Sequence, residues 1–323
     1  MAEAVIAHGR SEAVSPAVDV VIPTFNCARN LETCLSRLDA QLGRDGLRVI
    51  VVDAGSTDGT REVASAHGAQ VLVNPGQYGT GKNGARHFGE VRGDAPFVWY
   101  VDSDNFLLET TVLHDLLEPM RRDPSLMLAV PETAIDAKAR SIGRWLAKNE
   151  IEHVERAKRK GDRSNGYWVV PNFDYGLPNS VLIRRSAMEA VGGYDSDVRM
   201  LLRLRRAGLA RAAIVPTAHF YHNEANSPVE FLRKMNRRVT FFGKLTDQEL
   251  KEFFVEYPIP SESHQALMTV TVRDRLSTPV GALRNFLRTG EADWLWGAAY
   301  PFLLGLLVVR HPLLSRRVLS DVI

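Results

Sequence analysis

Two carboxylates stand at the end of an apolar run in the first third of this 323-residue chain. The run is residues 97–101, and Asp102 and Asp104 follow it, two positions apart. Side chains two apart on an extended chain share a face, so both carboxylates can point into one crevice. Carboxylate oxygens suit Mg²⁺ or Mn²⁺, and such an ion can hold a substrate's phosphates. The alternative is a strand-end turn with two solvated carboxylates.

The elements that must position this pair are predicted from the spacing of apolar residues. Short β-branched and apolar runs indicate strands, and apolar residues three to four positions apart indicate helices. The predicted strands are residues 18–22, 49–53, 71–73, 97–101, 126–130 and 212–216, and the predicted helices include residues 28–42, 60–67 and 107–122. Strands that alternate with helices predict an α/β fold with a mostly parallel sheet flanked by helices. Open sheets of this kind bind ligands beyond the carboxyl ends of their strands.

The loop after the first predicted strand narrows the class of protein. A dinucleotide-binding sheet carries Gly-x-Gly-x-x-Gly at this place, but this chain has Pro23-Thr24-Phe25-Asn26. Residues 79–84 contain glycines and a lysine, but not at the spacing of a Walker loop. An NAD-binding protein and a Walker-type nucleotide-binding protein are therefore both disfavoured.

Four motifs occur in a fixed order along the chain. They are Val21–Asn26, Val51–Thr60, Gly84–His87 and Val101–Asn105. In this order and at these intervals they resemble the inverting glycosyltransferases of family 2, which have the GT-A fold. The resemblance covers residues 18–225. It implies transfer of a sugar from a nucleoside-diphosphate sugar, with Mn²⁺ or Mg²⁺ as cofactor.

The resemblance also implies which residues bind the donor and the ion. The implied donor-binding residues are Pro23, Thr24, Phe25, Asn26, Asp53, Ser56, Lys82, Arg86, Asp102, Ser103, Arg233 and Arg237. The implied metal ligands are Asp102, Asp104 and His222, with His219 as the second choice of histidine. Arg233 and Arg237 stand one helical turn apart, which suits a phosphate clamp but also fits a solvated basic face. The chain departs from the family at Ala54, where an aspartate is usual, and at His87, where an asparagine is usual.

A later motif implies the catalytic base. Residues 192–195, Gly-Gly-Tyr-Asp, precede a predicted helix that in the family begins with Glu-Asp or Asp-Asp. Ser196 and Asp197 match those two places, so Asp197 inherits the role of base toward an acceptor hydroxyl. If the acceptor is a lipid phosphate, which is already ionised, Asp197 orients it instead. The alternative is that Asp197 only caps the helix; a further departure is Arg199, where the family has another aspartate.

The amino-acid composition limits which binding partners and which cellular compartment are expected. Lys and Arg total 40 against 38 Asp and Glu, so no nucleic-acid partner is expected. Cys27 and Cys34 are seven residues apart on one predicted helix, too far for a disulfide, which predicts free thiols in a reducing compartment. Residues 1–16 lack the apolar core of a signal peptide and are expected to be a frayed tail.

A basic stretch lies at residues 138–163, where nine Lys and Arg residues interleave with apolar ones. Its spacing fits a solvated amphipathic helix. It equally fits a surface that contacts anionic lipid or an acceptor phosphate.

An uncharged run at residues 294–309 lies near the C-terminus and is followed by Arg310. Its sixteen residues are fewer than the ~20 that one straight helix needs to span a bilayer. Trp294, Trp296 and Tyr300 at its start suit a membrane interface, which favours monotopic attachment. The alternative is a buried core helix or a dimer helix.

The predicted organisation is a GT-A domain followed by a C-terminal helical extension. The predicted parts are a tail at 1–16, the GT-A domain at 17–225, a helical extension at 226–290 and an apolar membrane-associated segment at 291–323. We expect a metal-dependent inverting glycosyltransferase, peripheral or monotopic at the cytoplasmic face of the cell membrane. Its expected acceptor is lipid-linked, a polyprenyl phosphate or another glycan, and a homodimer is compatible with the sequence. One alternative is a nucleotidyltransferase, but the Gly-rich loop usual in such enzymes is missing here. The other is a non-catalytic membrane scaffold, which the presence of Asp102, Asp104 and Asp197 together disfavours.

Overall fold

The computed structural model describes most of the predicted GT-A domain and a short C-terminal part. The described residues are 16–76, 79, 81–136, 139–174, 180–223, 229, 231–233, 280–297 and 299, without the side chains of residues 149 and 198. Arg237, residues 1–15 of the predicted tail and most of the apolar run at 294–309 lie outside them. Cys27 and Cys34 are free thiols, as predicted.

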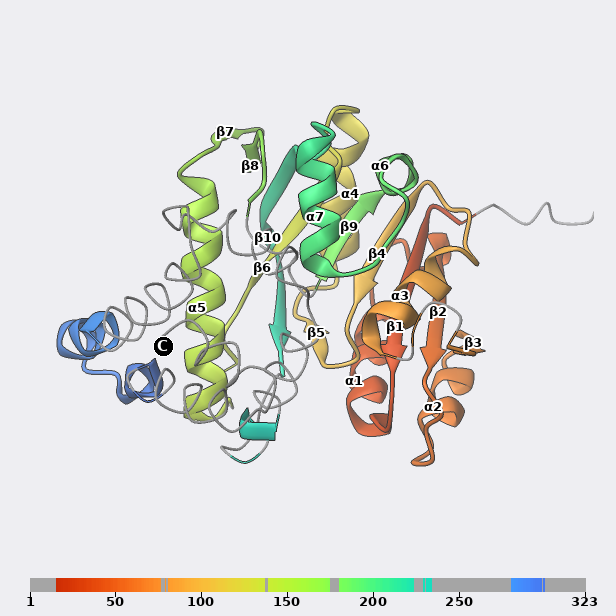
Figure 1. The fold of residues 1–323 in the computed structure, drawn as a ribbon, viewed down its shortest axis with the longest axis horizontal. Helices are drawn as coiled ribbons and strands as arrows, with labels where there is room; N and C mark the ends of the chain where they lie inside the picture. Colours follow the sequence, from red (N-terminus) through yellow and green to blue (C-terminus); the bar gives the residue numbers. More distant parts are fainter. Residues whose placement is uncertain are drawn as a thin grey trace, which may run out of the picture.

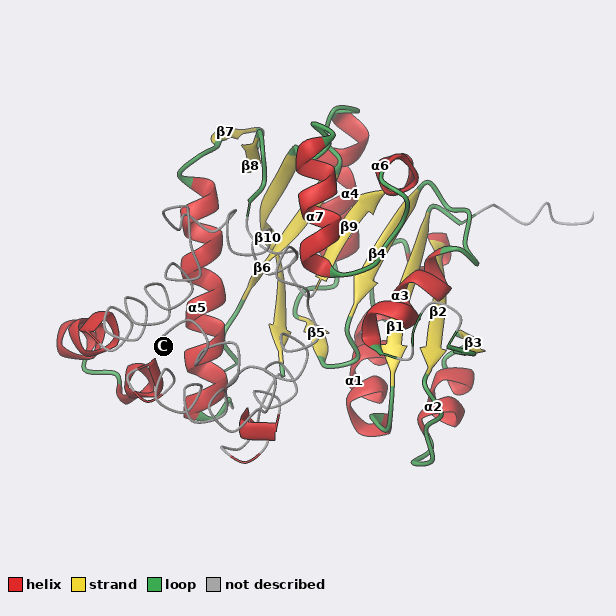
Figure 2. Ribbon diagram, in the orientation of Figure 1, coloured by secondary structure: helices red, strands yellow, loops and turns green. Residues whose placement is uncertain are grey.

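The described strands form one mixed sheet (Figures 1 and 2). They are β1 (Val18–Thr24), β2 (Leu47–Asp53), β3 (Gln70–Val73), β4 (Phe97–Val101), β5 (Asn105–Leu107), β6 (Leu128–Thr133), β7 (Asp162–Ser164), β8 (Tyr167–Val170), β9 (Ser180–Arg184) and β10 (Ala212–His222). Their order is β3-β2-β1-β4-β9-β6-β10-β8-β7, with β5 paired to β10. Neighbours among β3, β2, β1 and β4 are parallel, whereas β9 is antiparallel to both β4 and β6. Strand order therefore reverses at the β1–β4 boundary, where open sheets have their ligand crevice.

Helices cover both faces of this sheet (Figure 2). They are α1 (Ala28–Asp39), α2 (Thr60–Ala66), α3 (Lys82–Glu90), α4 (Val112–Arg122), α5 (Ser141–Lys158), α6 (Arg185–Ala190) and α7 (Asp197–Arg206), and residues 280–289 are also helical. Apolar residues of α1, α2 and α4 form one core with Val20, Ile22 and Trp99. Those of α3, α5, α6 and α7 form another with Val21 and Tyr100. Alternate residues of each central strand thus serve opposite cores, which explains their nearly continuous apolar sequences.

The segment after β4 corrects one predicted helix boundary. The helix predicted from residue 107 begins instead at Val112, because residues 105–107 form the short strand β5. This strand pairs with the end of β10, with Asn105 opposite His222. The backbone N–H of Asn223 also donates to the carbonyl oxygen of Asp104, at 2.8 Å. β5 therefore brings the end of β10 beside the turn that carries both aspartates.

The side of α5 away from the sheet packs against C-terminal residues. Ile142, Trp145, Phe231 and Trp294 form a third apolar cluster. The Arg144 guanidinium makes two 2.8 Å hydrogen bonds to the Asp293 carboxylate, and Trp296 donates to the Ser141 hydroxyl at 3.0 Å. Two tryptophans of the predicted membrane segment thus contact α5. Arg144 of the basic stretch is thus paired with a carboxylate of the protein. Among the described residues, no helix is long and apolar enough to cross a membrane.

Candidate active site

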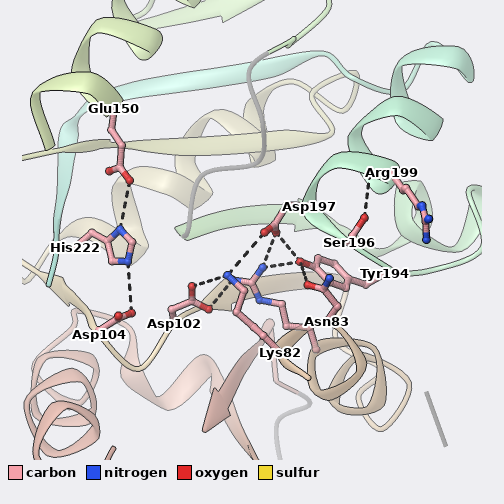
Figure 3. Close-up of polar contacts among 11 residues, drawn as sticks. Lys82, Asn83, Asp102, Asp104, Glu150, Tyr194, Ser196, Asp197, Arg199 and His222 are labelled. Carbon is pink, nitrogen blue, oxygen red and sulfur yellow. Dashed lines mark hydrogen bonds and ion pairs between the residues drawn. The ribbon is translucent and has the colours of Figure 1, made fainter. Parts of the chain in front are cut away.

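The candidate site lies beyond the carboxyl end of β4, at the sheet's reversal of strand order. Helix α3 packs closely against β1 because residue 89 is a glycine. A Cβ at this position would lie only 2.6 Å from a Val21 methyl group. This close approach places the first turns of α3 beside Asp102. Helix α7 begins nearby at Asp197, so two helices and one strand end converge (Figure 3).

Two cations join Asp102 to Asp197. The Arg86 guanidinium, 1% exposed, reaches Asp102 Oδ1 at 2.6 Å and Asp197 Oδ1 at 2.5 Å. Lys82 Nζ lies 3.1 Å from Asp102 Oδ2 and 3.8 Å from Asp197 Oδ2. Lys82 and Arg86 are four residues apart, so they share one face of α3. The structure therefore brings four predicted site residues from three motifs into one ionic network.

Tyr194 completes this network. Its hydroxyl donates to Asp197 Oδ1 at 2.5 Å and accepts from Arg86 at 2.6 Å. Its backbone N–H donates to buried Glu90 at 2.9 Å, which fixes the loop before α7. Gly193 precedes it at φ +79°, and a Cβ there would lie 2.8 Å from the His87 ring. Sequence reasoning noted the Gly-Gly-Tyr-Asp motif but did not select Tyr194 as a site residue.

The start of α7 bears on the two roles considered for Asp197. Ser196 is the N-cap residue, and its hydroxyl accepts the backbone N–H of Arg199 at 3.2 Å. Asp197 is the first helical residue, and its carboxylate turns toward Lys82 and Tyr194 rather than capping the helix (Figure 3). The Arg199 side chain points away from that carboxylate (Figure 3). The capping role therefore falls to Ser196, while the role of base stays a prediction.

The charges around Asp197 set its protonation state. Burial favours the neutral acid, but the Arg86 and Lys82 charges and the Tyr194 hydrogen bond together lower the pKa of Asp197 below its ordinary value. Burial and the neighbouring Asp197 charge raise the pKa of the Tyr194 phenol, despite Arg86, so it stays a hydrogen-bond donor. Asp197 is thus an ionised acceptor whose basicity the two cations suppress.

Asp104 belongs to a second group of side chains. Its Oδ1 lies 3.6 Å from His222 Nε2, and His222 Nδ1 lies 3.3 Å from Glu150 Oε1 on α5 (Figure 3). Burial lowers the pKa of His222, but Asp104 and Glu150 outweigh it and raise the pKa to about 10. His219, the second choice, instead contacts Glu109 at 3.0 Å. The first choice of histidine is therefore the one beside Asp104.

The two aspartates have different partners in this structure, and their joint role as metal ligands stays a prediction. Asp102 faces Lys82 and Arg86, whereas Asp104 faces His222. Within the described residues, no three His, Cys, Asp or Glu side chains form a ready metal cluster. The donor set of carboxylate oxygens and one imidazole nitrogen still suits Mn²⁺ or Mg²⁺. The second ring nitrogen of His222 also faces a carboxylate, as it does in many metal-ligating histidines.

The two loops predicted to bind the nucleotide, which follow β1 and β2, are hydrogen-bonded to each other. The buried Asp53 carboxylate accepts the backbone N–H groups of Gly55 at 3.0 Å and Ser56 at 2.9 Å. The Ser56 hydroxyl in turn accepts the Asn26 N–H at 2.8 Å. Phe25 is 61% exposed on the same loop, where its ring can meet a ligand. Asp53 therefore shapes the loop in this structure, and its contact with a nucleotide stays a prediction.

The remaining predicted donor residues lie outside these two groups of side chains. Thr24 is the last residue of β1, and its hydroxyl donates to the Asp53 carboxylate at 3.3 Å. Pro23 is buried in β1, and Ser103 is half-buried in the turn between the two aspartates. Arg233 is exposed in a short helical segment, and Arg237 lies outside the described residues. The proposed clamp of Arg233 and Arg237 is therefore untested.

Comparison with known proteins identifies the family. The profile described as "Glycosyl transferase family 2" matches residues 19–192, more than half of the chain. An uncharacterized glycosyltransferase of Mycobacterium tuberculosis is 40% identical over 88 residues, which are 27% of this chain and 37% of that protein. The succinoglycan biosynthesis protein ExoA of Rhizobium meliloti is 25% identical over 206 residues, 58% of each chain. This chain thus spans little more than a third of the first relative and over half of the second.

A solved structure matches the architecture. It is a mannosyltransferase from Pyrobaculum calidifontis in complex with GDP-Man and Mn²⁺, with a TM-score of 0.54 and 18% identity. The match covers 95% of this chain and 84% of that one. At this identity the match concerns the fold alone, and the predicted GT-A-type sheet flanked by helices is confirmed.

Proposed function

The chain belongs to glycosyl transferase family 2, and we propose that it moves a sugar from a nucleoside-diphosphate sugar to an acceptor with inversion. The observation that carries this proposal is the ionic network in which Lys82 and Arg86 join Asp102 to Asp197. The cations of this network can bind the diphosphate of a donor, and the Asp197 carboxylate can contact an acceptor. The groups that glycosyl transfer needs for the donor and for the acceptor therefore lie together at the end of β4.

The diphosphate would be bound by the exposed cation and by a divalent ion. Asp104 and His222, with Asp102 from the same turn, would hold Mn²⁺ or Mg²⁺. When bound, such an ion offsets the negative charge that develops on the leaving nucleotide. The complex of the Pyrobaculum mannosyltransferase with GDP-Man and Mn²⁺ supports this part of the proposal. The loops around Asp53 and Phe25 would receive the nucleoside.

Donor binding would also activate Asp197. The Lys82 side chain is 42% exposed, so it can turn from the carboxylates toward the donor's phosphates. Losing this neighbouring charge raises the pKa of Asp197 and makes it a stronger base. Arg86 and Tyr194 stay in place because they are buried, and they keep the carboxylate oriented. The base thus becomes competent only when the donor occupies the site.

In the proposed step, Asp197 accepts the proton of an acceptor hydroxyl. The hydroxyl oxygen bonds to the anomeric carbon from the face opposite the diphosphate. The bond from that carbon to the diphosphate oxygen breaks, and the nucleoside diphosphate leaves with the electron pair. An acceptor that is an ionised phosphate needs no base, and Asp197 then only orients it.

We also propose that the acceptor is lipid-linked and is met at a membrane surface. Helix 280–289 exposes Val280, Leu283 and Leu287 at helical spacing, which forms an apolar stripe on one face. Arg284 and Arg288 stand exposed beside that stripe. An apolar stripe flanked by arginines is the pattern of helices that lie in an anionic membrane interface.

The test of the transferase proposal is a panel of nucleotide sugars incubated with the full chain, Mn²⁺ and a polyprenyl phosphate or glycan acceptor. We expect release of a nucleoside diphosphate, and a product whose anomeric configuration is opposite to that of the donor. Release of pyrophosphate from a nucleoside triphosphate would identify a nucleotidyltransferase instead. Flotation with anionic liposomes tests the membrane part, with the double variant Leu283→Glu, Leu287→Glu expected to stay unbound.

A further inference from the structure

Glu150 lies behind the candidate metal ligands, and nothing in the motifs assigns it a role. It belongs to α5, and its side chain points toward His222 (Figure 3). Its Oε1 lies 3.3 Å from His222 Nδ1, and its Oε2 accepts the Thr133 hydroxyl at 2.9 Å. Thr133 ends β6, which runs beside β10. Glu150 is thus held by one neighbouring strand while it contacts the histidine of another.

We propose that Glu150 is the positioning residue that prepares His222 to bind the divalent ion. The inference rests on the proposed function, because it takes Asp104 and His222 as the ligands. A carboxylate that accepts a hydrogen bond from Nδ1–H keeps the hydrogen on that ring nitrogen. Nε2, the ring nitrogen left to bind the ion, then faces the side where Asp104 lies.

The geometry separates this role from that of a ligand. Glu150 meets Nδ1, whereas Asp104 meets Nε2, so the two carboxylates lie on different sides of the imidazole. Glu150 therefore faces the ring nitrogen that would not hold the ion. The imidazole is only 9% exposed, which leaves water little room to replace a lost partner. Removing Glu150 thus leaves a buried ring nitrogen without its carboxylate.

The helix that carries Glu150 offers a matched control. Glu152 lies two residues further along α5, with a 43% exposed side chain that contacts Arg156 at 3.9 Å. Glu152→Gln removes one negative charge from the same helix without touching His222. Glu150→Gln keeps an oxygen that can accept a hydrogen bond from Nδ1–H, whereas Glu150→Leu removes the acceptor entirely.

The test measures binding of Mn²⁺ alone to the full chain, from the electron paramagnetic resonance signal of the free ion. We expect Glu150→Leu to raise the Mn²⁺ Kd about tenfold or more, as the loss of such outer partners does elsewhere. Glu150→Gln should recover most of the affinity, and Glu152→Gln should match the parent. Unfolding midpoints of the variants show whether each is folded at the temperature of the titration.

The outcomes distinguish this inference from the proposed function on which it rests. If His222→Ala weakens Mn²⁺ binding but Glu150→Leu does not, the positioning role is wrong and the metal site stands. If His222→Ala and Asp104→Asn both bind Mn²⁺ like the parent, the proposed metal site is itself wrong. If Glu150→Gln loses as much affinity as Glu150→Leu, the charge of Glu150 and not its hydrogen bond is required, which overturns the positioning mechanism.

Discussion

Asp102 and Asp104 stand two residues apart, yet their surroundings differ in kind. Asp102 is paired with two cations, the buried Arg86 and the half-exposed Lys82. Asp104 faces His222, an imidazole whose far nitrogen meets another carboxylate. We call the first set, with Asp197 and Tyr194, the cation side, and the second set, with Glu150, the histidine side.

In the proposed function, this difference lets one turn serve two tasks. The cation side carries permanent positive charge that is already paired with carboxylates and can be offered to phosphates. The histidine side has carboxylate oxygens and an imidazole nitrogen, which are donor atoms that suit the proposed divalent ion. The short strand β5 produces the division, because it ties the residues after Asp104 to the end of β10.

The largest effect is expected on the cation side, from Asp197→Asn. Turnover should fall by about 10² to 10⁴, as expected for a lost general base, with little change in donor affinity. The control is Asp195→Asn, which removes a nearby carboxylate that contacts Arg203 at 3.1 Å instead of the network. Steady-state kinetics with the identified donor measure both. Near-parental turnover in a folded Asp197→Asn protein would remove Asp197 from the chemistry.

Arg86→Met should give the next largest effect, on stability. It leaves Asp102 and Asp197 without the buried cation between them, so the free energy of unfolding should fall by about 3 kcal/mol. Lys82→Met on the same helix face should cost about 1 kcal/mol or less, because that side chain is 42% exposed. Urea unfolding curves compare them. Equal losses in the two variants would mean that burial does not distinguish these cations.

The smallest expected effect is the pH dependence of stability. Because the folded pKa of Asp197 lies below its ordinary value, its contribution is present above about pH 3.9 and is lost as pH falls through the folded pKa. Asp197→Asn should therefore show a shallower decline in stability below about pH 4 than the parent. Urea titrations from neutral to acidic pH, without metal, measure the slope. Identical slopes would show that the cation side does not hold Asp197 ionised.

Much of the sheet could be predicted from the sequence, because buried parallel strands have an unmistakable apolar pattern. Residues 97–101 are fully buried in β4 as predicted, and the strands at 18–22 and 49–53 were also placed correctly. β5 was missed because three residues are too few to show a period, and Leu107 fits the helical spacing that follows. The sequence cannot reveal that such a short segment finds a partner 115 residues away.

The site residues could be proposed from motifs, but not their partners. Arg86 and Asp197 are 111 residues apart, so nothing local predicts their contact. Glu150 has no distinguishing signal either, because it is one of several glutamates on a charged helix. Trp294 was expected at a membrane interface from its place in an apolar run, yet it packs against α5. In each case a long-range contact decides the role, and residue type alone does not.

The central claim is that the histidine side binds an ion that helps the cation side hold a nucleoside diphosphate. Calorimetric titration of UDP and of GDP into the full chain, with and without Mn²⁺, tests it most directly. We expect at least one nucleotide to bind more tightly with Mn²⁺ in the parent protein. Asp104→Asn should remove that dependence while keeping the weaker, metal-free binding. Equal affinity with and without Mn²⁺ in the parent protein would contradict the account.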